Sequence, residues 1–349
     1  MSDNIIIKKE NLISHKKGNI SKEYILGKTI GTGSFGQVRL AIHKPTKQTR
    51  AIKIIKKKEI DMESLLSEIS VLSKLSHPSI MQIYEIFEDS LNVYLVSEYC
   101  KGGELFEIIS QKGSFTEKEA CLIMKQLMSG ICYSHQNGIV HRDLKPENII
   151  MDDESVDLTI KIIDWGCAKT LNKKEKLNSA DGTSYYIAPE VLRGSYDEKC
   201  DIWACGVIFY ILLCGYPPFN GEDDDEILQA VSKGDFVFPE EEWNSVSIEA
   251  KNLIKKMLTK KPKKRISALE ALQDIWFKQN EEKTKTNKKL AKNVLSNMKK
   301  FKKNRKLEKA TIAFIINQLI LKDERNEFCN ILGQWCLSRG PSRNSSPKP

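Results

Sequence analysis

The stretch HRDLKPEN, residues 141–148, places Asp143, Lys145 and Asn148 within one short segment. The Asp143 carboxylate can accept a hydroxyl proton and orient that oxygen. Lys145 can stabilise the charge of a phosphoryl group during its transfer. Asn148 can ligate Mg²⁺ through its amide oxygen, and Asp164 in KIIDWG supplies a second oxygen ligand. Asp143, Lys145, Asn148 and Asp164 are therefore predicted catalytic residues, and the last two are the predicted metal ligands.

Upstream, GTGSFGQV at residues 31–38 fits the pattern G-x-G-x-x-G-x-V between two β-rich segments. Its glycines allow the backbone to approach phosphates closely. A dinucleotide-binding loop would open a helix, whereas a β-rich segment follows here. Fifteen residues beyond Val38, Lys53 can hold the α- and β-phosphates of ATP. Glu68 on the next predicted helix is the carboxylate expected to hold that lysine, so both join the catalytic set.

The residue pattern predicts an α+β protein in two lobes. Residues 24–60 favour strands, and two further strands are expected at 83–87 and 93–97. Apolar spacing predicts a helix over 62–75. After residue 103 helices predominate, the first capped by Thr116 with Glu119 and ending before residue 138. A small sheet-rich half followed by a larger helical half implies a cleft between them.

Together with APE at 188–190, these motifs occur in the order found in eukaryotic protein kinases, and residues 24–277 resemble a Ser/Thr kinase domain. The Ser/Thr preference rests on Lys145 in DLKPEN and on Thr183 in GTSYYIAPE. The resemblance implies a bilobal kinase fold with a β-rich N-lobe and a helical C-lobe. It also implies a non-specific serine/threonine protein kinase (EC 2.7.11.1 class) that uses ATP and Mg²⁺.

The same resemblance implies a nucleotide site formed by the glycine-rich loop, the strands and the hinge. Val38, Ala51 and Ile150 would enclose the adenine, and Glu98 and Cys100 would offer it backbone groups. The full predicted set of nucleotide-site residues is Ile30, Gly31, Gly33, Ser34, Gly36, Val38, Ala51, Lys53, Ser97, Glu98, Cys100, Glu104 and Ile150.

The resemblance also assigns roles in inhibitor sensitivity, substrate specificity and regulation to single residues. Ser97 falls at the gatekeeper position, where a small side chain leaves a back pocket open to bulky inhibitors. Glu104 matches the acid that reads an Arg three residues before the phosphoacceptor, so basic substrates are expected. Ser179 falls where many kinases are phosphorylated, with Arg142 as the partner of the phosphate, although an unmodified serine is equally compatible with the sequence.

Buried contacts are also implied. Glu190 should pair with Arg265, and Asp201 should brace the catalytic loop. The hydrophobic column between the lobes would consist of Leu72, Ile83, His141 and Trp165.

Trp165 stands where kinases usually carry Phe. The casein kinase 2 family has the same triplet and is active, so the resemblance implies that Trp can serve. We expect the indole to fill the column and its N–H to find a partner. A bonded ring of this size should favour the inward, metal-holding state of Asp164.

Residues 293–319, NVLSNMKKFKKNRKLEKATIAFIINQL, predict a basic helix with Leu307, Ala310 and Phe314 at helical spacing. This stretch resembles the autoinhibitory junction of calcium-dependent protein kinases, as do CKGGELF and GTSYYIAPEVLRGSYDEKCDIWACGVI in the kinase domain. The resemblance implies a C-terminal regulatory helix that docks on the kinase domain or on calmodulin or a calmodulin-like protein.

The expected segments are an N-terminal extension (1–23), the kinase domain (24–277), a basic junction (278–322) and a remnant of a first EF-hand helix with a disordered tail (323–349). No calcium loop of the form D-x-[DN]-x-[DN]-G ending in Glu occurs in the sequence. Three interpretations stay open: a separate calmodulin-like sensor, loss of calcium control, or a gene prediction that is cut short.

Composition limits other functions. The formal charge of +9 comes from residues 283–309, which hold twelve Lys or Arg and one Glu, so nucleic-acid binding by the whole surface is not expected. The apolar run at 202–219 is broken at Gly215 and predicts a buried core helix rather than a membrane span. Scattered cysteines and the lack of a signal peptide predict a cytoplasmic protein, with the nucleus also open to it.

Two other classes of function compete with an active kinase. A pseudokinase scaffold would bind nucleotide or partners without turnover, and a calmodulin-binding module would act mainly through its basic helix. The presence of Lys53, Glu68, Asp143, Asn148 and Asp164 favours the enzyme.

Overall fold

The computed structural model describes residues 13–33, 36–105, 107, 115–152, 158–171, 176–177 and 184–282. The chain divides into two units, Met1–Lys303 and Asn304–Pro349, and every described residue belongs to the first. Predictions that lie outside the described residues are those for the basic helix at 293–319, the EF-hand remnant, Ser34, Ser179 and Thr183.

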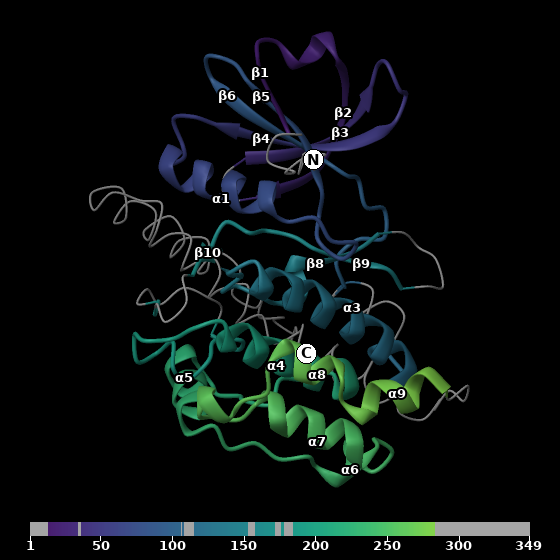
Figure 1. Ribbon diagram of the computed structural model, residues 1–349, viewed down its shortest axis with the longest axis vertical. Helices are drawn as coiled ribbons and strands as arrows, with labels where there is room; N and C mark the ends of the chain where they lie inside the picture. The colour runs from purple at the N-terminus through teal and green to yellow at the C-terminus, as the bar shows by residue number, and fades with distance from the viewer. Residues whose placement is uncertain are drawn as a thin grey trace, which may run out of the picture. The chain divides into compact units, whose positions relative to one another are not determined.

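The N-lobe is a six-stranded sheet in the order β1-β5-β6-β4-β3-β2 (Figure 1). Its strands are β1 (Ser14–Lys17), β2 (Tyr24–Gly33), β3 (Gly36–His43), β4 (Thr49–Lys56), β5 (Ile83–Glu88) and β6 (Asn92–Ser97). All neighbouring strands are antiparallel except β1 and β5. Helix α1 (Met62–Lys74) connects β4 to β5 and matches the helix predicted over 62–75.

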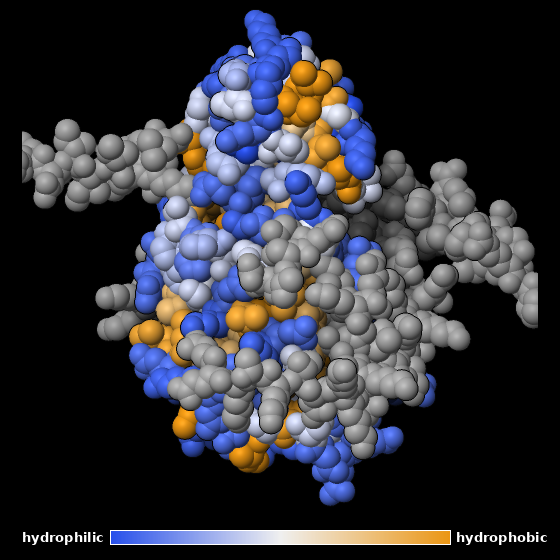
Figure 2. Space-filling view, turned by 90° about the vertical axis from the view of Figure 1, so that its right-hand side faces the viewer, coloured by the Kyte–Doolittle hydropathy of each residue, from blue (hydrophilic) through white to orange (hydrophobic). Residues whose placement is uncertain are grey.

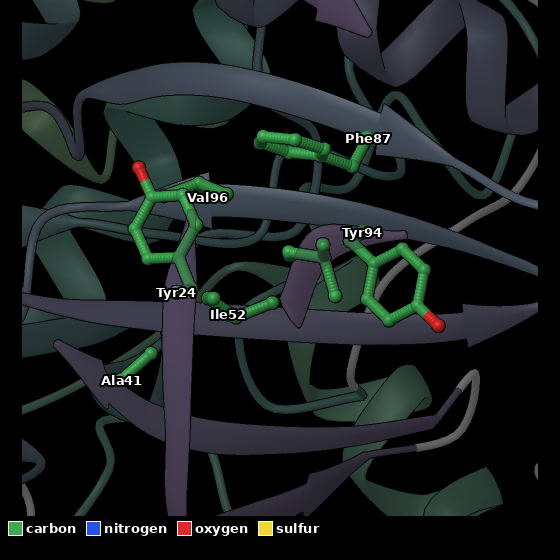
Figure 3. Packing of buried hydrophobic residues seen from close by; sticks show 7 residues of the cluster. Tyr24, Ala41, Ile52, Phe87, Tyr94 and Val96 are labelled. Atoms are coloured by element: carbon green, nitrogen blue, oxygen red, sulfur yellow. The ribbon is translucent and has the colours of Figure 1, made fainter. Parts of the chain in front are cut away.

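A cluster of apolar side chains from several strands holds this sheet together. It comprises Ile20, Tyr24, Ala41, Ile52, Phe87, Tyr94 and Val96, most of which are labelled in Figure 3. The Tyr24 ring meets the Phe87 ring edge-on at 5.8 Å between centroids. β-branched and aromatic residues pack well on a pleated surface, which explains why these segments form strands.

The sequence predicts an N-terminal extension over residues 1–23, and in the structure part of this stretch packs on the N-lobe. Strand β1 pairs in parallel with β5, and η2 (Ile20–Lys22) places Ile20 in the cluster with 2% of its surface exposed. The sequence SHKK of β1 has no apolar alternation, so it carries no strand signal. Backbone pairing with the edge of β5 and the burial of the adjacent Ile20 fix it instead.

The C-lobe is built around α3 (Glu117–Gln136) and α4 (Lys199–Cys214), which pack against each other (Figure 1). The predicted capping box of Thr116 and Glu119 is present at the start of α3. Every residue of α4 from Cys200 to Cys214 is buried, as predicted for a core helix, and Gly215 ends it at φ 90°. In the described part of the chain, no helix is both long and apolar enough to cross a bilayer.

Shorter helices complete the C-lobe. They are α5 (Asp224–Lys233), α6 (Glu240–Trp243), α7 (Ile248–Met257), η4 (Pro262–Lys264), α8 (Ala268–Leu272) and α9 (Ile275–Glu282). Helix α9 continues past residue 277, the expected end of the domain, and Asn280 on it is buried. Where Figure 2 shows described residues, polar ones are interspersed with apolar patches on both lobes.

Two small sheets connect the lobes and carry the predicted catalytic segments. One pairs β8 (Ile149–Met151) with β9 (Ile160–Ile162), and the other pairs β7 (Ile139–Val140) with β10 (Lys169–Thr170). The HRDLKPEN residues form the loop after β7 and the short helix η3 (Pro146–Asn148), and β9 is followed closely by Asp164. The predicted α+β architecture with a β-rich N-lobe and a helical C-lobe is confirmed.

Candidate active site

Asp201, at the start of α4, braces the loop that carries Asp143. Its carboxylate accepts the backbone N–H groups of His141 and Arg142, each at 2.9 Å, and lies 2.8 Å from Nε2 of His135. Burial would raise the pKa of Asp201, but the hydrogen bonds and the nearby histidines outweigh it and hold that pKa below its usual range. Arg142 has φ 73°, a strained conformation that these bonds maintain.

Lys145 and Asn148 both contact Asp143. Nζ of Lys145 lies 2.8 Å from Oδ2 of Asp143, and Nδ2 of Asn148 donates to the Asp143 carbonyl at 2.8 Å. Burial alone would lower the pKa of Lys145, but the adjacent carboxylate outweighs it and raises that pKa, so the ammonium stays charged. Because the Asn148 amide nitrogen is engaged, its carbonyl oxygen is the atom that could ligate a metal.

Asp164 follows β9 at φ 56°, a conformation that non-glycine residues rarely adopt. A Cβ at Gly166 would lie 3.3 Å from Oδ1 of Asp164 and 3.7 Å from Oε2 of Glu68, so both carboxylates approach this glycine. Asn148 and Asp164 offer hard oxygen donors of the kind that Mg²⁺ prefers when it also binds phosphates. These residues therefore fit the metal that the sequence predicted.

Lys53 and Glu68 form the predicted ion pair between β4 and α1. Their Nζ and Oε1 atoms are 3.4 Å apart, and the side chains are 29% and 10% exposed. In the sheet, Lys53 lies opposite Val38 of β3 and Leu95 of β6. The ammonium is thus anchored next to the glycine-rich hairpin, where a phosphate chain could reach it.

The glycine-rich hairpin joins β2 to β3, with Gly31 opposite Val38 and Gly33 opposite Gly36. Gly36 has φ 145°, and a Cβ there would collide with the carbonyl oxygen of Ile54. Only glycine fits this position. Ile30 lies near the end of β2 and is 38% exposed.

The predicted hinge follows β6. The Ser97 hydroxyl donates to the carbonyls of Glu98 at 3.2 Å and Ala51 at 3.4 Å. The Glu98 N–H donates to the Gln82 carbonyl at 3.1 Å, which leaves the Glu98 carbonyl as its backbone group for a ligand. Burial raises the pKa of Cys100 to about 12, so its thiol is not a nucleophile near neutral pH.

Beyond the hinge, the chain lies against β8. Gly102 donates its N–H to the Met151 carbonyl at 3.1 Å, and Met151 donates to the Gly103 carbonyl at 2.9 Å. Glu104 and Ile150 form a β-bridge. The predicted adenine contact Ile150 and the predicted substrate contact Glu104 are therefore neighbours.

Comparison with known proteins agrees with this geometry, since a model of the protein kinase domain family matches residues 24–277. The chain belongs to the protein kinase family. It is 48% identical over 305 residues to calcium-dependent protein kinase 5 of Plasmodium berghei, covering 86% of this chain and 54% of that one. With calcium-dependent protein kinase 3 of Plasmodium yoelii yoelii the identity is 43% over 320 residues, covering 91% and 60%. The chain spans about half the length of the curated relatives it matches.

Trp165 of the kinase domain corrects one prediction. The side chain is 1% exposed and packs on His141 at 4.6 Å between ring centroids, as expected for the column. However, no acceptor among the described residues reaches its buried Nε1. The expected bonded N–H is therefore wrong, and any preference for the inward state must come from packing alone. Sequence shows that an indole is present but not which way its N–H points.

The predicted pair of Glu190 and Arg265 is present deep in the C-lobe of the kinase. Nη2 of Arg265 donates to Oε2 of Glu190 at 2.9 Å, and its Nε donates to the Thr259 carbonyl at 2.9 Å. The Arg265 guanidinium also lies over the Trp203 ring at 5.0 Å. The pair ties the APE segment to the segment between η4 and α8.

Sequence reasoning missed three side chains and one backbone group that contact predicted kinase residues. Tyr196 accepts a hydrogen bond from Nη1 of Arg142 at 3.1 Å, and His135 contacts Asp201. The backbone N–H of Gln82 and the side chain of Lys161 both contact the Glu98 carboxylate. None of these four lies in a motif that signals phosphoryl transfer, so only the three-dimensional arrangement reveals them.

Proposed function

We propose that this chain is a Ser/Thr protein kinase that transfers the γ-phosphate of ATP to hydroxyls of basic protein segments. The observation that carries the proposal is the contact of both Lys145 and Asn148 with Asp143, on a loop braced by Asp201. This arrangement supports a carboxylate held in position to orient a substrate hydroxyl and accept its proton.

Each neighbouring residue has a role in the proposal. Lys145 neutralises charge on the transferring group, and Lys53, held by Glu68, binds the α- and β-phosphates. Bound Mg²⁺ supplies charge neutralisation for the phosphates, with Asn148 and Asp164 as its protein ligands. Val38, Ala51 and Ile150 enclose the adenine, and the hinge backbone at Glu98 and Cys100 orients it.

Two acidic residues support the proposed basic substrate. Glu104 is exposed beside the β-bridge to Ile150. Glu147 is half-buried, burial raises the pKa of its carboxyl, and its solvent-shielded Oε2 has no hydrogen-bond partner within the described ranges. An arginine side chain of a substrate that approached this carboxyl would favour its charged form and lower that pKa.

Regulation by the basic segment 293–319 is also part of the proposal. Its support is the name and similarity of the calcium-dependent relatives, together with the helical spacing of its apolar residues. Docking on the kinase domain would inhibit it, and a calmodulin or calmodulin-like protein would relieve the inhibition. We propose that the protein acts in calcium-linked signalling in the cytoplasm, and a nuclear location is also compatible with this proposal.

One assay tests these proposals. The full chain is incubated with Mg²⁺, ATP and a peptide containing Arg-x-x-Ser, with and without Ca²⁺-calmodulin, beside the Asp143→Ala variant. Phosphate transfer by the parent but not by Asp143→Ala is expected. Stimulation only when Ca²⁺-calmodulin is added would place the sensor on a separate protein. Absence of transfer under every condition would contradict the enzyme and favour a nucleotide-binding scaffold.

A further inference from the structure

The Glu98 carboxylate joins three segments that meet behind the hinge. Its Oε1 accepts the backbone N–H of Gln82 at 2.7 Å, and its Oε2 lies 2.8 Å from Nζ of Lys161. The Glu98 N–H returns a hydrogen bond to the Gln82 carbonyl at 3.1 Å. The side chains of Glu98 and Lys161 are 16% and 12% exposed, so solvent screens their ion pair far less than a surface pair.

Lys161 belongs to β9, the strand that leads to Asp164. The same strand is bonded to the segment before β5, because Ile162 donates its N–H to the Ser79 carbonyl at 2.7 Å and accepts from Met81 at 3.0 Å. The hinge, the segment 79–82 and β9 therefore form one hydrogen-bonded unit. Glu98 is the side chain that contacts the other two parts at once.

The position of this unit matters because a nucleotide must reach both of its ends. Its adenine would meet the hinge backbone at Glu98, and its phosphates would meet the metal held at Asp164. Two residues separate Lys161 from Asp164, so a shift of β9 against the hinge moves the metal ligand relative to the base. A misplacement of about 1 Å can cost about 100-fold in rate.

We propose that the Glu98 carboxylate is a positioning residue that fixes the hinge against β9 through Lys161 and so places bound ATP in register with Asp164. This inference rests on the proposed kinase function. Glu98 acts through its partners rather than on the reacting atoms, since its carboxylate is bonded to Gln82 and Lys161. Its effect should therefore appear in turnover and in metal-dependent binding rather than in adenine recognition.

Two matched substitutions in the full chain test whether the ion pair of Glu98 and Lys161 positions bound ATP. Glu98→Gln keeps an oxygen for the Gln82 N–H but removes the charge, and Lys161→Met keeps the length of the side chain without its ammonium. Each should lower kcat about 5- to 20-fold. The double variant should lose no more than either single one, because both remove the same interaction.

Lys161→Arg preserves the positive charge and should retain most of the parent kcat. Glu59→Gln is the control, because the Lys56–Glu59 pair has the same 2.8 Å separation but is 63% and 53% exposed. It should leave kcat unchanged. Equal kcat in the parent, Glu98→Gln and Lys161→Met would overturn the proposal, as would a drop in Tm without any change in kcat.

A binding measurement separates this proposal from the enzyme assignment. Affinity for a non-hydrolysable ATP analogue is measured by calorimetry with and without Mg²⁺. In Glu98→Gln and Lys161→Met the gain in affinity on adding Mg²⁺ should shrink at least about 3-fold, with metal-free affinity preserved. If the parent itself transfers no phosphate, the kinase assignment fails. Independently of that result, the positioning role of Glu98 is contradicted if Mg²⁺ increases the affinity for the analogue equally in the parent and in both variants.

Discussion

Arg265 in the C-lobe and Lys16 at the edge of the N-lobe each neutralise acidic groups, in opposite surroundings. The Arg265 side chain is fully buried, and besides both oxygens of Glu190 it donates to backbone carbonyls. Lys16 on β1 contacts Glu23 at 2.6 Å and Glu85 at 3.5 Å while 34% of its side chain is exposed. The buried charge must be paired, whereas the exposed one is screened by water and salt.

The difference indicates how each lobe is stabilised. In the C-lobe, Arg265 also donates to the Lys199 carbonyl at the start of the buried helix α4. Removal of either Arg265 or Glu190 therefore leaves the charge of the other one buried and unpaired. At the N-lobe edge, β1 is fixed by backbone pairing and by Ile20, and its charges add little. The predictions below follow this order, from the buried ion pair to the exposed groups.

The largest effect is expected for Arg265→Met, which leaves the Glu190 carboxylate buried without its partner. We expect the free energy of unfolding to fall by about 3–5 kcal/mol, measured by urea denaturation. Adding Glu190→Leu to this variant should restore part of the loss, because the unpaired charge is then removed. Lys56→Met, at an exposed pair, is the control. A loss below about 1 kcal/mol in Arg265→Met would contradict the contrast between the lobes.

Ile20→Ala tests whether residues 14–23 belong to the N-lobe. Truncating this buried side chain should lower the free energy of unfolding by about 2–4 kcal/mol, because it leaves a cavity against Tyr24 and Phe87. Ile25→Ala is the matched control, since Ile25 is 53% exposed on β2 and should change stability by less than about 0.5 kcal/mol. Equal urea midpoints for the two variants would mean that the segment is a dispensable extension.

These two sites also show what the sequence could predict. The pair of Glu190 and Arg265 was predictable through the resemblance to protein kinases, which rests in part on the APE motif that ends at Glu190. The docking of residues 14–23 was not, because β1 offers only polar side chains and its partner strand lies about 70 residues away. Among site residues, motif positions such as Asp143 and Asp164 were predictable, whereas the contacts of Glu98 with Gln82 and Lys161 depend on how separate segments meet.

Trp165→Phe tests a buried polar group of the opposite kind to Arg265, because the Trp165 N–H has no hydrogen-bond partner in the described part of the chain. The change removes an unbonded N–H, which favours the folded state, but leaves a small cavity, which opposes it. We expect the free energy of unfolding to change by less than about 1.5 kcal/mol and kcat to stay within about 3-fold of the parent. Activity gained only in Trp165→Phe, with an inert parent, would contradict the view that Trp165 supports an active site.

Lys16→Met should have a smaller effect, less than about 1 kcal/mol in 0.1 M salt. Part of the loss of charge pairing with Glu23 and Glu85 is offset because the Met stem still covers Phe87, over whose ring Nζ of Lys16 lies at 5.2 Å. The difference from the parent should vanish in 1 M salt, where exposed charges are screened. A loss above about 2 kcal/mol that persists in 1 M salt would place Lys16 in the same class as Arg265.

The smallest effect concerns His77, whose Nδ1 accepts the backbone N–H of Ser79 at 3.0 Å while Nε2 lies 2.9 Å from the Ser129 hydroxyl. Burial, and then the charge of Lys161, lower the pKa of His77 below 6.5, so the folded state favours the neutral ring. Below pH 6.5 the unfolded chain binds a proton more readily than the folded one, and folding is weakened as pH falls. Above pH 6.5 the neutral His77 ring makes its full contribution to the free energy of unfolding. His77→Asn should therefore show a flatter decline of the urea midpoint between pH 7 and about pH 5 than the parent does. Parallel declines in the two proteins would mean that the ring takes up its proton equally well in the folded and unfolded chain.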